Sequence, residues 1–390
     1  MGSLHHTAKR NSIPEGWRNL KLGSVFSLSS GNSKPENTIS ILTDENVIPV
    51  YGGNGVLGYT DKCQDVGEQL VIGRVGINCG NIYYINGPYW ITDNALYARE
   101  WKTEVIIKYI CYHLSYLDLG KLKSKTGQPL VSQKPIYDLP ISLPPICEQK
   151  KVSQILTTWD RAIERVQRLI EAKQRQKDQL VSQLLSGQKR FPGFQDEWKQ
   201  VRLGTFVHPK FRKVIKPDGA YLRLGIRSHG KGTFTSVVDD PETIALTHLF
   251  QARKDDLIVN ITFAWEGAIA LVGPDGDGAL VSHRFPTYVF DTSKMLPEYF
   301  KHLMVTTRFF YELDLISPGG AGRNRVMNKG DFLKIAVTVP DIEEQKKIAG
   351  VLGGMDEQIA LLNKYLEKLK VQKKGLMQKL LTGEIRVKVD

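Results

Sequence analysis

The stretch PPICEQKKVSQIL, residues 144–156, recurs as PDIEEQKKIAGVL at residues 340–352, shifted by 196 positions. The correspondence runs without a gap from 143–190 to 339–386, and it closes on LVSQLLSGQKR in the first copy and LMQKLLTGEIR in the second. An internal repeat of this length indicates that one module occurs twice in the chain. We therefore expect a target that also has two halves.

Both repeated segments predict a long helix with a coiled-coil seam. Apolar residues alternate in steps of four and three, which is the spacing of such a seam. The seam residues are Trp159, Ile163, Val166, Ile170, Leu180 and Leu184 in the first copy, and Met355, Ile359, Leu362, Leu366, Leu369, Leu376 and Leu380 in the second. Lysines interrupt the seam at Lys173, Lys177 and Lys373, and a polar seam residue can fix register or partner choice.

Proline and glycine mark the ends of these helices. Pro144 and Pro340 stand at the entries, and Gly187 and Gly383 stand where a left-handed C-terminal cap would fall. About 38 residues at ~1.5 Å each would make a rod of ~57 Å. Two such helices in one chain are expected to pack against each other.

The repeat extends to the start of each module. WRNLKLGS at 17–24 is echoed by WKQVRLGT at 198–205, while the interiors, roughly 25–127 and 206–323, share little sequence. Short β-branched or aromatic runs separated by Gly, Asn and Pro predict strands in both interiors. The predicted strands are 47–51, 69–72, 81–85 and 96–98 in the first interior, and 221–226, 257–262, 268–272 and 287–290 in the second. Helical spacing predicts helices over 104–117 and 297–312.

The expected fold class is therefore α+β, with two globular domains and two long helices. The predicted boundaries are 1–142 for the first domain, 143–190 for the first repeated helix, 191–338 for the second domain and 339–390 for the second helix. A formal net charge of +12 favours a polyanionic partner. The four cysteines all lie in the first half without a CxxC pair, and no long apolar run or secretory signal is visible, which favours a reducing, cytoplasmic location.

Several stretches of the sequence come close to a known catalytic or nucleotide-binding motif, but each lacks a required residue or element. The GNGVLG run at 53–58 matches G-x-G-x-x-G but is not followed by a helical pattern, so a glycine-rich turn is favoured over a nucleotide site. The near P-loop at 225–231 has Gly232 where a magnesium-binding Ser or Thr is needed. LPPIC at 143–147 does not satisfy the [DN]PP[YF] pattern of a methyltransferase, and the histidines lack metal-ligand spacing. The sequence predicts no catalytic residue and no metal site.

The repeated motifs resemble the specificity subunit of Type I restriction–modification enzymes. The resemblance rests on PP-[IL]-x-EQ-K-[KR]-[IV] before a long helix, an LLTGEIR-like ending and a W-x-x-x-[KR]-L-G opening, each present twice. YGGNGVLGY at 51–59, VIGRVGINCG at 71–80 and WITDNALY at 90–97 are similar to one class of target-recognition domain in that family.

The resemblance implies a non-catalytic subunit whose two domains each read one half of a split DNA site. It also implies an antiparallel coiled coil that sets the gap and binds two methyltransferase subunits, with two restriction or translocase subunits completing the complex. S-adenosylmethionine, ATP and Mg are expected in those partners, and no cofactor is expected in this chain. A separation of ~34 Å would place both domains on the same groove face of DNA.

Gly-flanked loops with Arg, Asn, Gln or Lys are the candidates for DNA contact, because Arg suits guanine and Asn or Gln suits adenine. The candidates are Asn54, Arg74, Asn78, Lys125, Thr126, Gln128, Arg227, His229, Lys231, Arg323, Asn324 and Arg325. The shift of 196 aligns Gln128 with Asn324. For each candidate, phosphate contact or plain surface competes with base contact.

Because both copies keep EQKK, this motif is a candidate for docking methyltransferase subunits. The docking candidates are Glu148, Gln149, Lys150, Glu344, Gln345 and Lys346. A structural role for Glu in the first turn of a helix is the competing interpretation.

Two other functions remain open from the sequence. One is a nuclease or methyltransferase with fused recognition domains, which would be active alone. The other is a coiled-coil adaptor without DNA specificity. Unlike interiors on a repeated frame favour a sequence-specific subunit with an asymmetric, bipartite target.

Overall fold

The computed structural model describes residues 14–124, 127–319 and 325–389. The chain divides into two compact units. Unit 1 comprises the chain up to Gln167 together with the part from Lys364 onward, and unit 2 comprises Arg168–Asn363. In the part of the chain that is described, no helix is both long and apolar enough to cross a membrane.

Unit 1 is built on a six-stranded sheet in the order β2-β7-β5-β6-β3-β4. Its strands are β2 (Phe26–Ser30), β3 (Ile48–Gly52), β4 (Gly55–Thr60), β5 (Asp65–Gly73), β6 (Ile82–Ile91) and β7 (Ala95–Trp101). Helix α1 (Ile107–Leu117) packs on β5 and β6, and the short α2 (Gln133–Tyr137) follows it. The core between sheet and helix buries Leu70, Ile72 and Tyr109 completely.

Unit 2 has two sheets in its interior, ordered β10-β18-β15-β16 and β11-β14-β17-β12-β13. The strands are β10 (Val207–Pro209), β11 (Lys213–Ile215), β12 (Tyr221–Ile226), β13 (Thr233–Val238), β14 (His248–Gln251), β15 (Leu257–Val259), β16 (Ile269–Leu271), β17 (Leu280–Val281) and β18 (Thr287–Phe290). The helices are α4 (Pro297–Leu303), α5 (Thr307–Leu315) and α6 (Lys329–Phe332). Phe206, Phe300 and Phe309 form the aromatic centre of the core.

The repeated opening motif forms the same small sheet in both units. β1 (Arg18–Lys21) pairs antiparallel with β8 (Pro140–Leu143), and β9 (Lys199–Arg202) pairs antiparallel with β19 (Ala336–Val339). The registers correspond, because Arg18 faces Leu143 and Lys199 faces Val339. Each opening strand is thereby joined to the strand just before a repeated helix, so the frame of the module closes in the same way twice.

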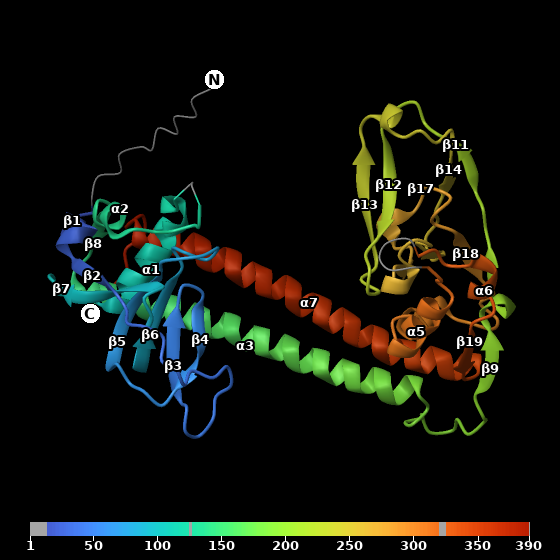
Figure 1. Cartoon of the computed structure of the whole chain (residues 1–390), viewed down its shortest axis with the longest axis horizontal. Helices are drawn as coiled ribbons and strands as arrows, with labels where there is room; N and C mark the ends of the chain where they lie inside the picture. Colours follow the sequence, from blue (N-terminus) through green and yellow to red (C-terminus); the bar gives the residue numbers. More distant parts are fainter. Residues whose placement is uncertain (1–13, 125–126, 320–324, 390) are drawn as a thin grey trace. The chain divides into compact units, whose positions relative to one another are not determined.

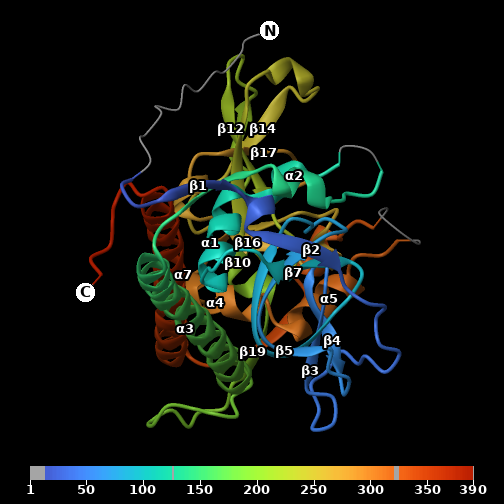
Figure 2. The ribbon, with the colours of Figure 1, turned by 90° about the vertical axis from the view of Figure 1, so that its left-hand side faces the viewer.

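The two long helices are α3 (Ile146–Leu185) and α7 (Ile342–Leu381), and each contributes one part to each unit. They lie side by side (Figures 1 and 2). They begin just after the predicted prolines, and Gly187 and Gly383 follow them with φ of 73° and 74°, which confirms the predicted left-handed caps.

Burial along both helices follows the predicted seam. Leu184, Met355, Leu366, Leu369 and Leu380 are buried. The other seam positions are partly buried, namely Trp159, Ile163, Val166, Ile170, Lys173, Lys177, Leu180, Ile359, Leu362, Lys373 and Leu376.

Several predicted elements differ from the structure, and three of them are the following. The helix predicted over 297–312 is broken after Leu303, and the Thr306 side chain caps α5 by accepting a hydrogen bond from the Phe309 N–H (3.3 Å). The strand predicted over 257–262 stops at Val259, because the chain there enters a turn. The glycine-rich run at 53–58 is a turn only at residues 53–54, since β4 begins at Gly55.

Candidate nucleic-acid interface

Three segments that are far apart in sequence converge in unit 1. They are the turn after β5 (74–81), the hairpin tip between β3 and β4, and the segment 127–131. Val75 bridges to Leu130, and the Val131 N–H donates to the Arg74 carbonyl (2.9 Å). The hairpin lies so close to the turn that a Cβ at Gly73 would collide with the Gly53 carbonyl oxygen. The sequence candidates of unit 1 that the structure describes, Asn54, Arg74, Asn78 and Gln128, are therefore brought together.

The candidate side chains of this cluster are available to a partner to different degrees. Asn54, Asn78 and Gln128 are exposed, and each amide can both donate and accept hydrogen bonds. Arg74 is half-buried, and its Nη1 donates to Ser30 Oγ (2.8 Å). The predicted Lys125 and Thr126 lie outside the described residues.

One residue of this cluster was missed from the sequence. Lys123 Nζ donates to the Ile77 carbonyl (2.7 Å) and so fixes the tip of the turn. Lys123 lies outside the Gly-flanked run, and its contact with Ile77 joins residues 46 positions apart. The sequence pattern therefore did not indicate it.

Unit 2 contains a turn at the corresponding place, with an unrelated sequence and a short 3-10 helix at Ala264–Glu266. RVGINCG at 74–80 corresponds to ITFAWEG at 261–267, and the final glycines, Gly80 and Gly267, have φ of 92° and 72°. The segment before the second helix closes this turn as in unit 1, since the Met327 N–H donates to the Ile261 carbonyl (2.8 Å). Met327 stands 196 positions after Val131, so the equivalence follows the repeat.

The candidate loop 227–232 packs against this second turn. The His229 N–H donates to the Glu266 carbonyl (2.7 Å), and the Gly230 N–H donates to the Gly267 carbonyl (2.8 Å). His229 has a left-handed backbone with φ of 61° and an exposed side chain. Lys231 is also exposed. The loop therefore presents two basic side chains beside the turn.

Arg227 is exposed but already has partners. Its Nη1 donates to the Thr233 carbonyl (2.6 Å), and its guanidinium lies 5.0 Å from the centre of the Phe234 ring. A guanidinium held in this way can still contact phosphate with its remaining N–H groups.

Arg325 already has several partners within unit 2, and its contact with DNA stays a prediction. Its side chain donates to the carbonyls of Ser317 (2.9 Å) and Asp314 (2.8 Å), pairs with the Asp314 carboxylate (2.8 Å) and lies over the Trp265 ring. These contacts use the guanidinium to anchor the chain next to the turn. The predicted Arg323 and Asn324 lie outside the described residues.

The EQKK glutamates are buried at the start of each helix. The buried Glu344 carboxylate accepts hydrogen bonds from Arg190 Nη2 (2.7 Å) and Trp198 Nε1 (3.1 Å). The Glu148 carboxylate accepts hydrogen bonds from Trp17 Nε1 (2.9 Å) and Arg386 Nε (3.0 Å). Because 190 and 386 differ by 196, the same three-residue cluster is built in both units.

The neighbouring glutamines bind the backbone of their own unit. Gln149 accepts from the Ile106 N–H (2.9 Å) and donates to the Pro144 carbonyl (2.9 Å). Gln345 accepts from the Leu296 N–H (3.0 Å) and donates to the Pro340 carbonyl (3.0 Å).

The docking prediction is therefore wrong for Glu148, Gln149, Glu344 and Gln345, because these buried side chains hold the helix to its own domain. Lys150 and Lys346 are exposed, and their docking role stays a prediction.

Two of the three seam lysines, Lys177 and Lys373, have carboxylate partners on the opposite helix. Lys177 Nζ lies 2.6 Å from Asp356 Oδ1, and Lys373 Nζ lies 2.5 Å from Asp160 Oδ1. The two pairs are equivalent under the repeat, because Asp356 stands 196 positions after Asp160 and Lys177 stands 196 positions before Lys373. The sequence repeat showed all four residues, but it did not show that the lysine of one copy meets the aspartate of the other.

The same aspartates also bind the domain helices. Asp160 accepts from the Tyr112 hydroxyl (2.5 Å), whereas Asp356 pairs with Lys301 (2.9 Å). Burial alone would raise the pKa of Asp356, but its bonds with Lys177 and Lys301 outweigh burial and hold that pKa below the ordinary value. Each aspartate thus ties together two long helices and one domain.

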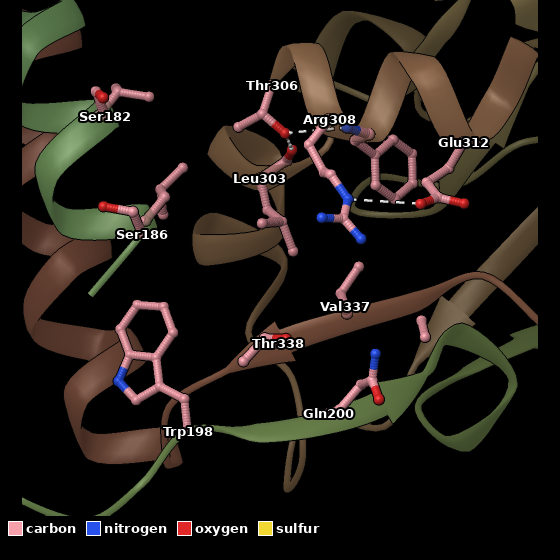
Figure 3. A pocket seen from close by; sticks show the side chains of 14 residues that line it. Ser182, Ser186, Trp198, Gln200, Leu303, Thr306, Arg308, Glu312, Val337 and Thr338 are labelled. Atoms are coloured by element: carbon pink, nitrogen blue, oxygen red, sulfur yellow. Dashed lines mark hydrogen bonds and ion pairs between the residues drawn. The ribbon is translucent and has the colours of Figure 1, made fainter. Parts of the chain in front are cut away.

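A pocket of about 530 Å³ lies in unit 2 between the end of α3, the β9–β19 sheet and α5 (Figure 3). Trp198, Leu303 and Val337 contribute apolar surface, and Arg308 and Glu312 form an ion pair across 3.5 Å. The pocket contains none of the predicted DNA-binding residues. Among the described residues, no group of three or more His, Cys, Asp or Glu side chains is placed to hold a metal ion.

Comparison with known protein families identifies the family of the repeated module. The model of the Type I restriction modification DNA specificity domain matches the chain twice, over residues 14–174 and 195–371. The chain belongs to this family. Each match takes in one repeated opening, one interior and most of one long helix, so the family's domain is the repeated module.

Type I specificity subunits match the chain over almost its full length or over about a third of it. It is similar to the specificity subunit of the Type I restriction enzyme MjaVIII from Methanocaldococcus jannaschii, with 23% identity covering 96% of this chain and 94% of the relative. It is also similar to the EcoprrI specificity subunit from Escherichia coli, with 28% identity over 36% of this chain and 35% of the relative. The fold is shared with the Type I restriction–modification S subunit from M. genitalium, with a TM-score of 0.65, 16% identity and coverage of 96% and 98%.

Proposed function

We propose that this chain is the specificity subunit of a Type I restriction–modification complex and that it reads an asymmetric, bipartite DNA site. One observation carries the proposal. Two unlike interiors place a turn at the same point of a repeated frame. The turn of unit 1 carries Arg74 and Asn78, and the turn of unit 2 is bonded to the loop that carries His229 and Lys231. Different side chains in and beside the two turns would select different half-sites.

In this proposal α3 and α7 form an antiparallel coiled coil, and the two modules are related by a pseudo-twofold axis. The exchange of partners between copies supports this arrangement, since Asp160 pairs with Lys373 as Asp356 pairs with Lys177. The Glu148–Arg386 and Glu344–Arg190 pairs follow the same rule. A helix pair of this kind would hold the two half-sites at a fixed spacing.

The chain itself is proposed to be non-catalytic. Two methyltransferase subunits would bind S-adenosylmethionine, and two restriction or translocase subunits would use ATP and Mg, in the cytoplasm where chromosomal DNA is the substrate. Exposed Lys150 and Lys346 are the remaining docking candidates at the helix starts.

The test is to map DNA methylation by the full-length chain combined with its methyltransferase subunit. We expect methylation at a split site with unlike halves. Exchanging residues 25–127 for those of a related subunit should change one half only, and exchanging 206–323 should change the other half only.

Three results would contradict the proposal. A continuous palindromic site would remove the two-domain arrangement. Methylation or cleavage by the purified chain alone would favour a fused enzyme. An unchanged DNA preference after both exchanges would favour a non-specific adaptor.

A further inference from the structure

An apolar side chain stands at the tip of the unit 1 turn. Ile77 is 78% exposed, whereas Cys79 and Gly80, which follow it in the same turn, are buried. Isolated exposed apolar residues are common on protein surfaces. This one differs because it is surrounded by the polar candidates for DNA contact.

The backbone that carries Ile77 is held from several sides. The Gly76 N–H donates to the Pro129 carbonyl (3.0 Å), the Cys79 N–H donates to the Gly76 carbonyl (3.0 Å), and Lys123 Nζ donates to the Ile77 carbonyl itself (2.7 Å). A turn with this many bonds presents its tip in one position, as a base-contacting residue requires.

The neighbours of Ile77 are hydrogen-bonding groups. Asn78 follows it directly, Asn54 lies beside Gly76 across the hairpin, and exposed Gln128 precedes the segment that bonds the turn. Phosphate contacts need N–H or O–H donors, which the Ile77 side chain lacks. In the major groove the apolar group offered by a base pair is the C5 methyl of thymine.

We propose that Ile77 contacts the 5-methyl group of a thymine in the half-site that unit 1 reads. This inference rests on the proposed function, and it adds one base to it. The equivalent position in unit 2 is Ala264, which is completely buried, so the contact belongs to one half-site only.

The experiment uses the full-length chain and DNA duplexes that carry its preferred site, selected from random sequence. Each thymine is replaced in turn by deoxyuridine, which lacks only the methyl group, and the Kd is measured by fluorescence anisotropy. Wild type is compared with Ile77→Ala and with Ile215→Ala, a matched control at an 80% exposed isoleucine in unit 2.

For wild type and Ile215→Ala, we expect one deoxyuridine in one half-site to weaken binding about fourfold, the factor for one buried methyl group. Ile77→Ala should bind the thymine and deoxyuridine duplexes equally, with its thermal unfolding unchanged because the side chain is exposed.

The inference is overturned if no deoxyuridine weakens binding by the wild type, or if Ile77→Ala responds to the same substitution as wild type does. A half-site without thymine overturns it as well. Failure of the proposed function is a different result, because the selection would then yield no preferred site at all.

Discussion

Glu148 and Glu344 each hold three pieces of chain at one buried carboxylate. A carboxylate removed from water requires charged or N–H partners, or it would be protonated or would destabilise the fold. In each cluster the tryptophan comes from the start of the same module, and the arginine comes from the end of the other module. At the scale of single residues, the module is therefore closed by a hydrogen-bonded charge cluster as well as by apolar packing.

The indole N–H groups in these clusters should contribute measurably to stability. Trp17→Phe and Trp198→Phe each remove a donor to a buried carboxylate, and we expect a loss of roughly 1.5–3 kcal/mol for each in urea unfolding. Trp90→Phe is the matched control, since Trp90 Nε1 donates to the neutral Ser33 carbonyl at an exposed position. An equal loss for Trp90→Phe would argue against a special role of the carboxylates.

Two buried histidines should make the protein sensitive to mild acid. Burial lowers the pKa of His113 to about 4, and burial lowers the pKa of His302 to about 4 as well. The unfolded chain binds a proton near its ordinary pKa of ~6.5, so stability is fully present above that pH. It should fall as pH drops from ~6.5 towards ~4, by up to about 3 kcal/mol per histidine.

The measurement is the free energy of unfolding between pH 7.5 and pH 4. His113→Leu should flatten this dependence, because leucine binds no proton in either state. His208→Leu, at an exposed position in β10, is the control and should keep the wild-type slope. An unchanged slope in His113→Leu would exclude this histidine as the cause.

At the scale of elements, swapping the lysine and the aspartate of a seam ion pair should recover different amounts of stability in the two units. Lys373→Asp places two carboxylates together, and adding Asp160→Lys should restore most of the lost stability, since the other partner of Asp160 is the neutral Tyr112 hydroxyl. Lys177→Asp with Asp356→Lys should recover less, because the new lysine would face Lys301.

A double-mutant cycle on each pair gives the answer, with the unfolding free energy measured for both single variants and the double variant. We expect a coupling on the order of 1 kcal/mol for these partly buried pairs. Equal recovery in the two units would show that Lys301 does not sense the exchange.

The elements that carry a period were predictable from the sequence, and the contacts that join them were not. Four–three spacing fixed the seam, and the proline and glycine positions fixed both helix ends, because these are local properties of the chain. The break in the helix after Leu303 was missed, because apolar spacing continues through it and only the Thr306 cap marks the restart.

For the candidate site, Gly-flanked polar loops pointed to Asn54, Arg74 and Asn78, and the structure brings them together. The equivalence of the turns at 74–80 and 261–267 was hidden, since backbone hydrogen bonds fix the turn and allow its side chains to differ. The EQKK carboxylates were misassigned because sequence does not show whether a charged group already has a buried partner.

At the scale of the whole molecule, each unit borrows a helix part from the other half of the chain. Leu380 and Leu381 complete the core of unit 1, and Leu184 completes that of unit 2. A fragment spanning 14–190 lacks Leu380 and Leu381 but carries their equivalents, Leu184 and Leu185. We expect this fragment to dimerise, with Glu148 of one copy paired with Arg190 of the other, and to select a palindrome of one half-site.

Sedimentation equilibrium tests this prediction directly. The wild-type fragment should be a dimer at micromolar concentration, and Arg190→Glu should shift it towards monomer by opposing Glu148. A fragment that is stable, folded and monomeric would show that the borrowed helix part is dispensable.

The charge cluster of unit 1 has one more consequence, because its members come from the two ends of the chain. Arg386 Nη1 donates to the Glu15 carbonyl (2.9 Å), whereas the equivalent Arg190 and Trp198 in unit 2 are joined by the residues 191–197. The order of these contacts along the chain is therefore circular, and only the connection between 386 and 17 is not covalent. A gene that closed 386 to 17 and opened the chain within 191–197 would encode the two domains in the opposite order and specify the same set of contacts.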